Sequence, residues 1–428
     1  MSKLPDFPRI RLLELVSAGE RPEQRQPVLR DPQGYARSAA LSEWGVAIVR
    51  LLNGQRSFQE IADLCGEEMG GSVSVEDVRR FIQQLDDSLF LDSERFAEHV
   101  RSVRREYANL KTRPAVHAGG AYAATAEALA DQLSRHCLSD AGPGVLPWEG
   151  AGEERKSTNR LCAVMSPHID LYRGGDTYAW AYDRVLDETD ADTFVILGTA
   201  HTQLPSLFSV CRKDFATPLG RSQCDSDSVE KLLAVYARHA GPRAAAHFAD
   251  DFPHRQEHSI ELQTLWLQYA LGDRRPYRIV PVLVGSFYPF ISQGIRPDFN
   301  LEVVGFVDAL RRLVTSNPRV CVIAAVDMAH IGPQFGDAEA VDEARLRQLW
   351  TADQHLLSLA CAGDAEGWYD AIAENNDCNR ICGLAPMYVM LSALEPLRGE
   401  LLRYDQARSL DASCCVSFAS AAFYRPEA

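Results

Sequence analysis

Four short segments of the sequence each place a histidine where it could bind a metal ion or move a proton. These segments are Ser166-Pro167-His168, Leu197-Gly198-Thr199-Ala200-His201, Glu257-His258-Ser259-Ile260-Glu261 and Asp327-Met328-Ala329-His330. Imidazole is the commonest protein ligand of transition metals and the usual general base near pH 7. The segments therefore predict a metal site or an acid–base site.

Three of these segments follow apolar, β-branched runs that predict strands, at 161–164, 193–197 and 320–326. In an open α/β sheet, ligands and reactive groups gather beyond the carboxyl ends of the strands. Histidines that are far apart in the sequence can therefore meet at one edge of the sheet. For any one histidine taken alone, a buried imidazole bonded to a backbone carbonyl is the competing interpretation.

From residue 159 onward, predicted strands and helices alternate along the chain. The predicted strands cover 160–165, 193–198, 277–285, 319–327 and 415–423. The predicted helices cover 177–188, 227–240, 258–271, 301–315, 338–360 and 386–394. This alternation predicts an α/β fold with a mainly parallel central sheet flanked by helices. A polar stretch at 142–159 predicts an exposed loop.

The N-terminal part of the chain predicts a small domain of its own. A turn at Asp31-Pro32-Gln33 favours a hairpin, and an apolar pattern over 42–52 favours a helix. Ser57-Phe58-Gln59-Glu60 is a capping box that opens a second helix, Ser74 begins a third, and 88–92 predicts a short strand. Three helices ending in a strand indicate a winged-helix domain. We expect this domain at 1–96, a charged connector at 97–112 and the α/β domain at 113–428.

Composition narrows the classes of function. A chain of 428 residues with 46% hydrophobic and 24% charged residues is typical of a globular protein of two domains. Acidic residues exceed basic ones by 59 − 44 = 15, which argues against a nucleic-acid or anionic-membrane partner. We find no secretory signal and no membrane-spanning run, so we expect a cytoplasmic protein whose eleven cysteines are reduced thiols.

The order of the motifs carries a family likeness. Residues 113–428 resemble the Memo-like family, whose fold is similar to that of class III extradiol dioxygenases. The likeness begins at Arg113 and His117-Ala118-Gly119-Gly120-Ala121-Tyr122, where Ala121 replaces an expected aromatic residue, continues through the four histidine segments and ends at Ile381-Cys382-Gly383. The resemblance implies that His168, His201 and Cys382 form the metal pocket.

The implied ligand set bears on the choice of metal. Two histidines and one anionic ligand suit non-haem Fe(II) when the anion is a carboxylate, as it is in the dioxygenases. A thiolate from Cys382 softens the site, which leaves copper and zinc open beside the expected Fe(2+) and puts ring-opening chemistry in doubt.

The resemblance also implies a role for His330, which matches the acid–base histidine of the related dioxygenases. Asp327 lies three residues earlier and could orient that imidazole, although an aspartate that caps the following helix is the alternative. We expect His258 to line the open side of the site. His258 and Glu261 could also orient a ligand, but acidic residues at a helix start are equally explained by the macrodipole. His254 is predicted to be a solvated loop residue.

Residues 51–62 and 85–91 resemble the PqqD-like domains, which bind leader peptides. The resemblance implies a leader peptide or a partner protein at the N-terminal domain, and a docking module without a peptide ligand is the alternative.

Two functions remain in view. The first is a non-haem iron-dependent, dioxygenase-like oxidoreductase acting on a small aromatic molecule or a peptide-borne group. The second is a non-catalytic peptide-binding or scaffolding protein with a vestigial metal pocket.

Overall fold

The computed structural model describes residues 4–18, 26–149, 161–272 and 274–426. The chain divides into two compact units, Met1–Leu110 and Lys111–Ala428. Each unit is described by itself below. The last part of the loop predicted at 142–159 lies outside the described residues.

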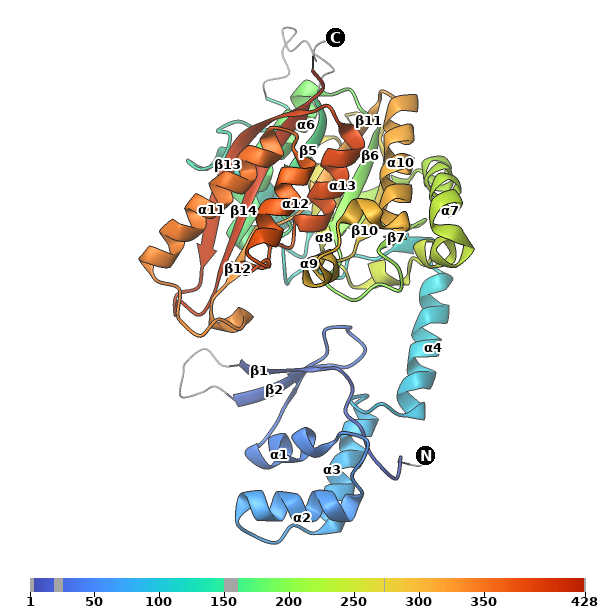
Figure 1. Ribbon diagram of the computed structural model, residues 1–428, viewed down its shortest axis with the longest axis vertical. Coiled ribbons are helices and arrows are strands. Elements are labelled where there is room, and N and C mark those ends of the chain that lie inside the picture. Colours follow the sequence, from blue (N-terminus) through green and yellow to red (C-terminus); the bar gives the residue numbers. More distant parts are fainter. Residues whose placement is uncertain (1–3, 19–25, 150–160, 273, 427–428) are drawn as a thin grey trace. The chain divides into compact units, whose positions relative to one another are not determined.

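The first unit consists of a small antiparallel sheet followed by helices (Figure 1). Its elements are β1 Glu14–Ala18, β2 Gln26–Arg30, β3 Ala39–Ala40, α1 Glu43–Leu51, α2 Phe58–Met69, α3 Val75–Asp87 and α4 Glu94–Ala108. The side chains of Ser42, Ser57 and Ser74 each accept a backbone N–H from the first turn of their helix. The local sequence thus sets where these helices begin.

Two expectations for this unit need correction. The hairpin is present between β2 and β3, but its second strand lies at Ala39–Ala40 because Asp31 holds the intervening loop. The Asp31 carboxylate accepts the N–H groups of Gln33, Tyr35 and Ala36. The strand predicted at 88–92 is a turn with one isolated bridge from Leu91. Leu89 has a φ of 65°, which does not fit a strand.

The second unit is built on an eleven-stranded sheet. Its strands are β4 Thr112–Arg113, β5 Leu161–Ser166, β6 Thr193–Thr199, β7 Phe208–Val210, β8 Asp214–Thr217, β9 Gly220–Cys224, β10 Arg278–Val284, β11 Val320–Ala325, β12 His330–Ile331, β13 Arg398–Arg408 and β14 Cys415–Tyr424. The order is β12-β14-β5-β11-β6-β10-β9-β8-β4, with β13 beside β14 and β7 beside β10.

The sheet is mixed rather than mainly parallel. Its centre, β5-β11-β6-β10, is parallel, as the alternation of strands and helices predicts. Strands β14, β13 and β12 form an antiparallel edge, in which β13 and β14 are joined by a short loop at 409–414. Their connection contains no helix, and a parallel pair would need one.

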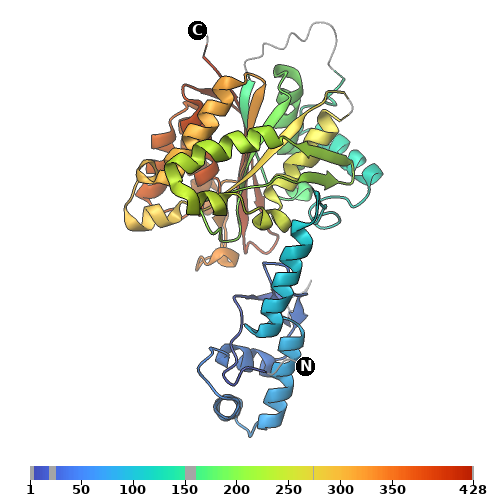
Figure 2. The ribbon, with the colours of Figure 1, turned by 90° about the vertical axis from the view of Figure 1, so that its right-hand side faces the viewer.

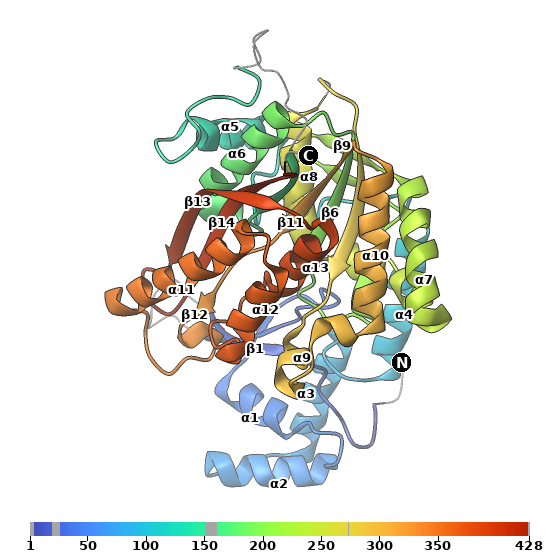
Figure 3. The same cartoon turned by 45° about the horizontal axis from the view of Figure 1, so that its top comes forward.

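Helices cover both faces of the sheet (Figure 3). They are α5 Ala126–Leu138, α6 Leu171–Glu188, α7 Ser226–Phe248, α8 Ser259–Ala270, α9 Tyr288–Gln293, α10 Leu301–Ser316, α11 Glu343–Cys361, α12 Ala365–Glu374 and α13 Leu384–Leu394. Helices α5, α6 and α8 pack on one face, and α10, α11, α12 and α13 pack on the other. Helix α7 packs on α10 (Figure 2).

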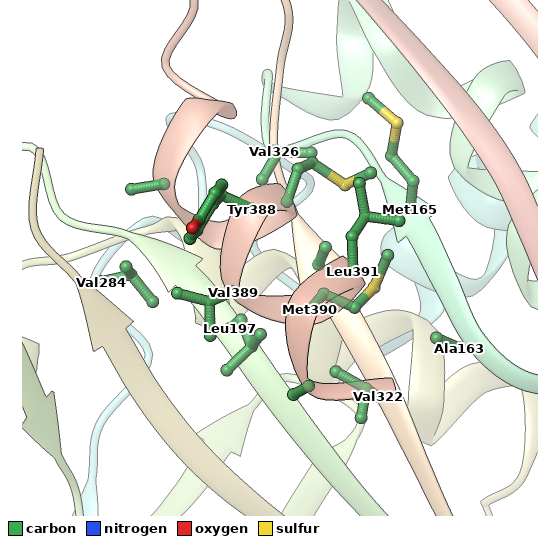
Figure 4. Packing of buried hydrophobic residues seen from close by; sticks show 14 of the residues in the cluster. Ala163, Met165, Leu197, Val284, Val322, Val326, Tyr388, Val389, Met390 and Leu391 are labelled. Carbon is green, nitrogen blue, oxygen red and sulfur yellow. The ribbon is translucent and has the colours of Figure 1, made fainter. Parts of the chain in front are cut away.

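The two hydrophobic layers follow from the alternation of side chains along each strand. Residues Val195 and Leu197 of β6 face the α13 side, whereas Phe194 and Ile196 face α8. Figure 4 shows Val389, Met390 and Leu391 of α13 packed over Leu197 and Met165. Both faces of the central strands are buried, which explains why these strands are continuously apolar.

No helix among the described residues is long and apolar enough to cross a membrane. All eleven cysteine side chains carry free thiols.

Asp353 is a fully buried carboxylate of this unit that has no cation beside it among the described residues. The Oδ2 atom of Asp353 on α11 accepts the hydroxyl groups of Ser417 (2.6 Å) and Tyr404 (2.8 Å). Burial raises the pKa of Asp353 to about 6, although these two hydrogen bonds oppose the shift.

Replacing Asp353 with Asn should therefore stabilise the protein at alkaline pH. The folded pKa lies above the unfolded value, so the wild-type contribution is complete at low pH and is lost as pH rises through about 6. Between pH 5 and pH 8 the advantage of Asp353→Asn in unfolding free energy should grow by about 1.4 kcal/mol. Urea unfolding of both proteins at the two pH values measures this change. A difference that does not vary with pH would contradict it.

Candidate metal centre

The carboxyl ends of three adjacent parallel strands place the first residues of the site. Strands β5, β11 and β6 are neighbours, and just beyond their last residues lie His168, Asp327 and His201. Gly198 allows this close packing, because a Cβ there would lie 2.6 Å from Ser259 and Ile260 of α8. The sheet topology thus brings together residues that are far apart in the sequence.

The structure gathers three imidazoles at this edge. His258, the residue immediately before α8, joins His168 and His201. The ring centroids are separated by 4.9 Å (His168–His201), 5.4 Å (His168–His258) and 4.5 Å (His201–His258). One potential ligand atom from each residue lies within 4.8 Å of the others. His168 is buried, whereas the side chains of His201 and His258 are 39% and 31% exposed, so the cluster has an open side.

Backbone and carboxylate oxygens lie against Nδ1 of each ring. The Nδ1 of His168 donates to the carbonyl of Ala325 (2.9 Å). The Nδ1 atoms of His201 and His258 lie 3.0 Å and 3.2 Å from the same oxygen of Glu257. Because Nδ1 donates in His168 and His201, Nε2 of these two rings keeps its lone pair, and Nε2 of His168 lies 3.5 Å from the Cys382 sulfur and 3.6 Å from Oδ2 of Asp327. Three imidazoles that each bring a ligand atom into one cluster fit a transition metal.

Burial keeps two of these rings neutral. It lowers the pKa of His168 to about 3, with a further contribution from nearby His201, and it holds the pKa of His258 well below the usual value. Burial also acts to lower the pKa of His201, but the adjacent Glu257 carboxylate outweighs it and raises that pKa. Metal binding at His201 therefore competes with a proton.

Glu257 is the residue that sequence reasoning missed. Its carboxylate accepts the backbone N–H groups of His201, His258 and Ser259 as well as the ring contacts. Burial raises the pKa of Glu257, but His201 and the hydrogen bonds hold it well below the usual range. The only signal in the sequence was its position beside His258. Carboxylates that orient metal-ligating histidines in this way are a common feature of metal sites.

Replacing Glu257 with Gln should weaken metal binding about 10–100-fold. The amide of Gln carries no negative charge, so the Nδ1 atoms of His201 and His258 lose the charged oxygen that lies beside both of them. Competition with a chromophoric chelator measures the affinity. The variant Glu302→Gln, whose wild-type side chain accepts hydrogen bonds from Ser206 and Tyr236 instead, serves as the control. Equal affinities for Glu257→Gln and wild type would rule out the anchoring role.

Cys382 lies beside the imidazoles. Its Sγ is 3.5 Å from Nε2 of His168 and 3.4 Å from the carbonyl oxygen of Asp327. Burial, reinforced by the Asp327 carboxylate, raises the pKa of Cys382 well above its usual value, so the thiol is neutral without a metal. Among the described residues, the close group of ligand atoms consists of the three imidazoles and does not include this sulfur.

Among the described residues no hydrogen bond joins Asp327 to His330, although the charge of Asp327 acts to raise the pKa of His330. The Oδ1 of Asp327 accepts the N–H groups of His168 (2.9 Å) and Ile169 (3.2 Å), so this carboxylate supports the neighbouring loop. Burial raises the pKa of Asp327. The Nδ1 of His330 is buried without a hydrogen-bond partner in the part of the chain that the structure describes, and its ring lies against Phe335.

Two further expectations are corrected at the start of α8. Glu261 forms no hydrogen bond or ion pair with the three imidazoles: it forms a fully buried ion pair with Arg113 and accepts the hydroxyl of Tyr122. His254 is buried, not solvated, and its Nε2 bonds to the carbonyl of Ser209 (3.0 Å). Arg113 also donates to the carbonyls of His254 (2.8 Å) and Glu257 (2.7 Å). These residues fix the backbone that presents Glu257 and His258.

The fold and the site together define an α/β protein with a candidate metal centre at the carboxyl edge of its parallel strands. Comparison with known proteins gives the family. Residues 113–422 match the family described as Memo-like protein, and the chain belongs to that family.

Relatives match over two different extents. A MEMO1 family protein of Aquifex aeolicus is 24% identical over 420 residues, covering 97% of this chain and all of that protein. A MEMO1 family protein of Methanobrevibacter smithii is 30% identical over 318 residues, covering 73% of this chain and 99% of that protein. The protein memo-1 homolog of Caenorhabditis elegans is 28% identical and covers 73% of this chain and 83% of its own length.

Proposed function

We propose that the protein is a non-haem iron-dependent oxidoreductase, dioxygenase-like in its site, that acts on a small aromatic molecule or a peptide-borne group. The observation that carries this proposal is the cluster of His168, His201 and His258, in which Nδ1 of His168 and His201 donates a hydrogen bond and Nδ1 of His258 lies beside Glu257. Iron held there would supply redox chemistry with dioxygen. Copper and zinc are the alternatives that the same ligands would accept.

The ligand set proposed from the family likeness is His168, His201 and Cys382. The position of His258 supports its addition to this set. Because the thiol of Cys382 is 3.5 Å from His168 Nε2, it would join the set on losing its proton, and metal binding would therefore release a proton. Asp327 supports the site by fixing the backbone of His168 and Ile169.

His330 is proposed as the acid–base residue. Burial lowers its pKa to about 4, although Asp327 opposes the shift, so the ring is neutral at pH 7 and can accept a proton. Its Nδ1 is buried and has no hydrogen-bond partner among the described residues, which supports this role, because such an atom is costly unless a substrate or water uses it.

Replacing His330 with Gln should lower the turnover of iron-loaded protein about 100-fold and leave the bound iron unchanged. Oxygen uptake with catechol-type substrates and with modified peptides measures turnover, and elemental analysis measures iron. If wild-type protein with stoichiometric iron consumed no oxygen with any of these, the second function, a non-catalytic binding or scaffolding protein with a vestigial pocket, would be favoured.

A PqqD-like role is proposed for the N-terminal unit, in which a winged-helix domain would recognise a leader peptide or a partner protein. A cavity of about 480 Å³ between α1 and α3 supports the idea. Trp44 and Phe81 line this cavity, and their ring centroids are 5.1 Å apart. Titration of the full chain with candidate leader peptides, read by tryptophan fluorescence, tests it. Absence of any binding would favour a docking module without a peptide ligand.

The proposed cellular location is the cytoplasm, where free thiols persist.

A further inference from the structure

The loop that carries Asp327 and His330 is held on strand β14 by the pairing of β12 with Val416 and Cys415 and, just before that pairing, by Ser417. The carbonyl of Ser417 accepts the N–H of Met328 (2.8 Å), and its own N–H donates to the carbonyl of Ala329 (3.0 Å). The hydroxyl oxygen of Ser417 accepts the N–H of Ala329 (3.0 Å). Three hydrogen bonds thus hold the two residues that lie between Asp327 and His330.

The hydroxyl of Ser417 also connects the loop to α11. It donates its hydrogen to Oδ2 of Asp353 (2.6 Å), and both residues are fully buried. Tyr404 donates to the same oxygen (2.8 Å), while Gln406 donates to the hydroxyl of Tyr404 (2.7 Å). All the donors in this chain point toward Asp353, which is the final acceptor.

Asp353 determines the direction of the hydrogen bond to the loop. A hydroxyl has one hydrogen to donate. Because Asp353 takes the hydrogen of Ser417, the oxygen of Ser417 is left to accept from Ala329. Without an acceptor at position 353, the hydroxyl is free to rotate away from the loop amide.

The position of Asp353 is costly for folding. It forms no ion pair among the described residues, and its second oxygen, Oδ1, is buried without a hydrogen-bond partner there. A buried carboxylate without a cation destabilises a protein. Residues that break such rules are expected where function requires them, and the hydrogen bonds of this residue lead to the candidate site.

We propose that Asp353 is a positioning residue that, through the hydroxyl of Ser417, fixes the loop presenting Asp327 and His330 to the metal centre. The role of this loop in chemistry rests on the proposed function. Because Asp327 in turn holds the backbone N–H of His168, a shift of the loop would also reach the imidazole cluster.

The test uses the full chain with ¹⁵N-labelled histidine and the variants Asp353→Leu, Asp353→Asn and Ser417→Ala. We expect Asp353→Leu and Ser417→Ala to shift the ring resonances of His330 in metal-free protein and to weaken Co(II) binding about tenfold. Asp353→Asn keeps an acceptor for Ser417 and should restore both readouts. The double variant Asp353→Leu/Ser417→Ala should bind Co(II) no more weakly than either single variant, because both substitutions remove the same contact.

Wild-type ring resonances of His330 in Ser417→Ala would overturn the proposal, as would an Asn variant that behaves like Leu. Ser417→Ala carries the test if Asp353→Leu does not fold. The resonances are read without metal, so they decide this inference even if wild-type protein binds no cobalt. A wild-type protein that bound no cobalt would contradict the proposed function instead.

Discussion

Replacing both His168 and His201 with Ala should abolish stoichiometric metal binding. Structural metal sites with four ligands bind with about 10–16 kcal/mol, so each lost ligand costs about 3 kcal/mol and the pair lowers the affinity by more than about 10⁴-fold. The loss follows from the geometry, since these rings follow β5 and β6, the parallel strands on either side of β11, and each contributes a ligand atom to the same cluster.

The measurement is metal analysis of anaerobically purified protein after loading with ferrous iron and removal of excess. Wild-type protein should retain about one ion per chain, and the double variant almost none. His355→Ala, which removes an exposed histidine of α11, is the matched control and should retain the wild-type amount. Equal iron in the double variant and in wild type would place the metal elsewhere.

Replacing Arg113 with Ala should destabilise the second unit by about 3–5 kcal/mol. The change leaves Glu261 fully buried without its cation. It also removes the donors to the carbonyls of His254 and Glu257, so the backbone that presents His258 loses its support. At present the Arg113 guanidinium outweighs burial and keeps the pKa of Glu261 below its usual value.

Chemical unfolding monitored by far-ultraviolet circular dichroism measures this loss. Arg408→Ala is the control, because the Arg408–Glu343 pair has side chains that are 33% and 73% exposed and should contribute less than about 1 kcal/mol. If Arg113→Ala cost no more than Arg408→Ala, the pair would not anchor the start of the domain.

The parts of the fold that could be predicted are those with strong hydrophobic patterns. The central strands β5, β6, β10 and β11 are buried on both faces, so their apolar runs mark them clearly. Strand β13 was missed because its sequence, Arg398–Arg408, is largely polar and its side chains are only half-buried. The antiparallel edge that it forms with β14 was missed with it.

The candidate site could be predicted as far as strand ends determine it. His168 and His201 follow β5 and β6 directly, and parallel topology brings them together. Glu257 and His258 come from the start of a helix, and their approach depends on the buried contacts of Arg113, which leave no local pattern.

The roles of Asp327 and His330 were also hard to predict, because their contacts leave no local pattern in the sequence. A spacing of three residues suggested that they pair, but Asp327 bonds across to the loop of His168. The loop that carries Cys382 contains Asn376, Asp377 and Arg380 with positive φ, and propensities do not predict such backbone turns.

The central claim is that the imidazoles of His168, His201 and His258 bind one metal ion through their Nε2 atoms. Anomalous diffraction from a crystal of the iron-loaded protein, recorded at the iron edge, tests this claim most directly. We predict one strong peak about 2.0–2.2 Å from the Nε2 atoms of His168 and His201, within reach of His258. A peak at any other place, or no peak in a crystal whose protein carries stoichiometric iron, would contradict the claim.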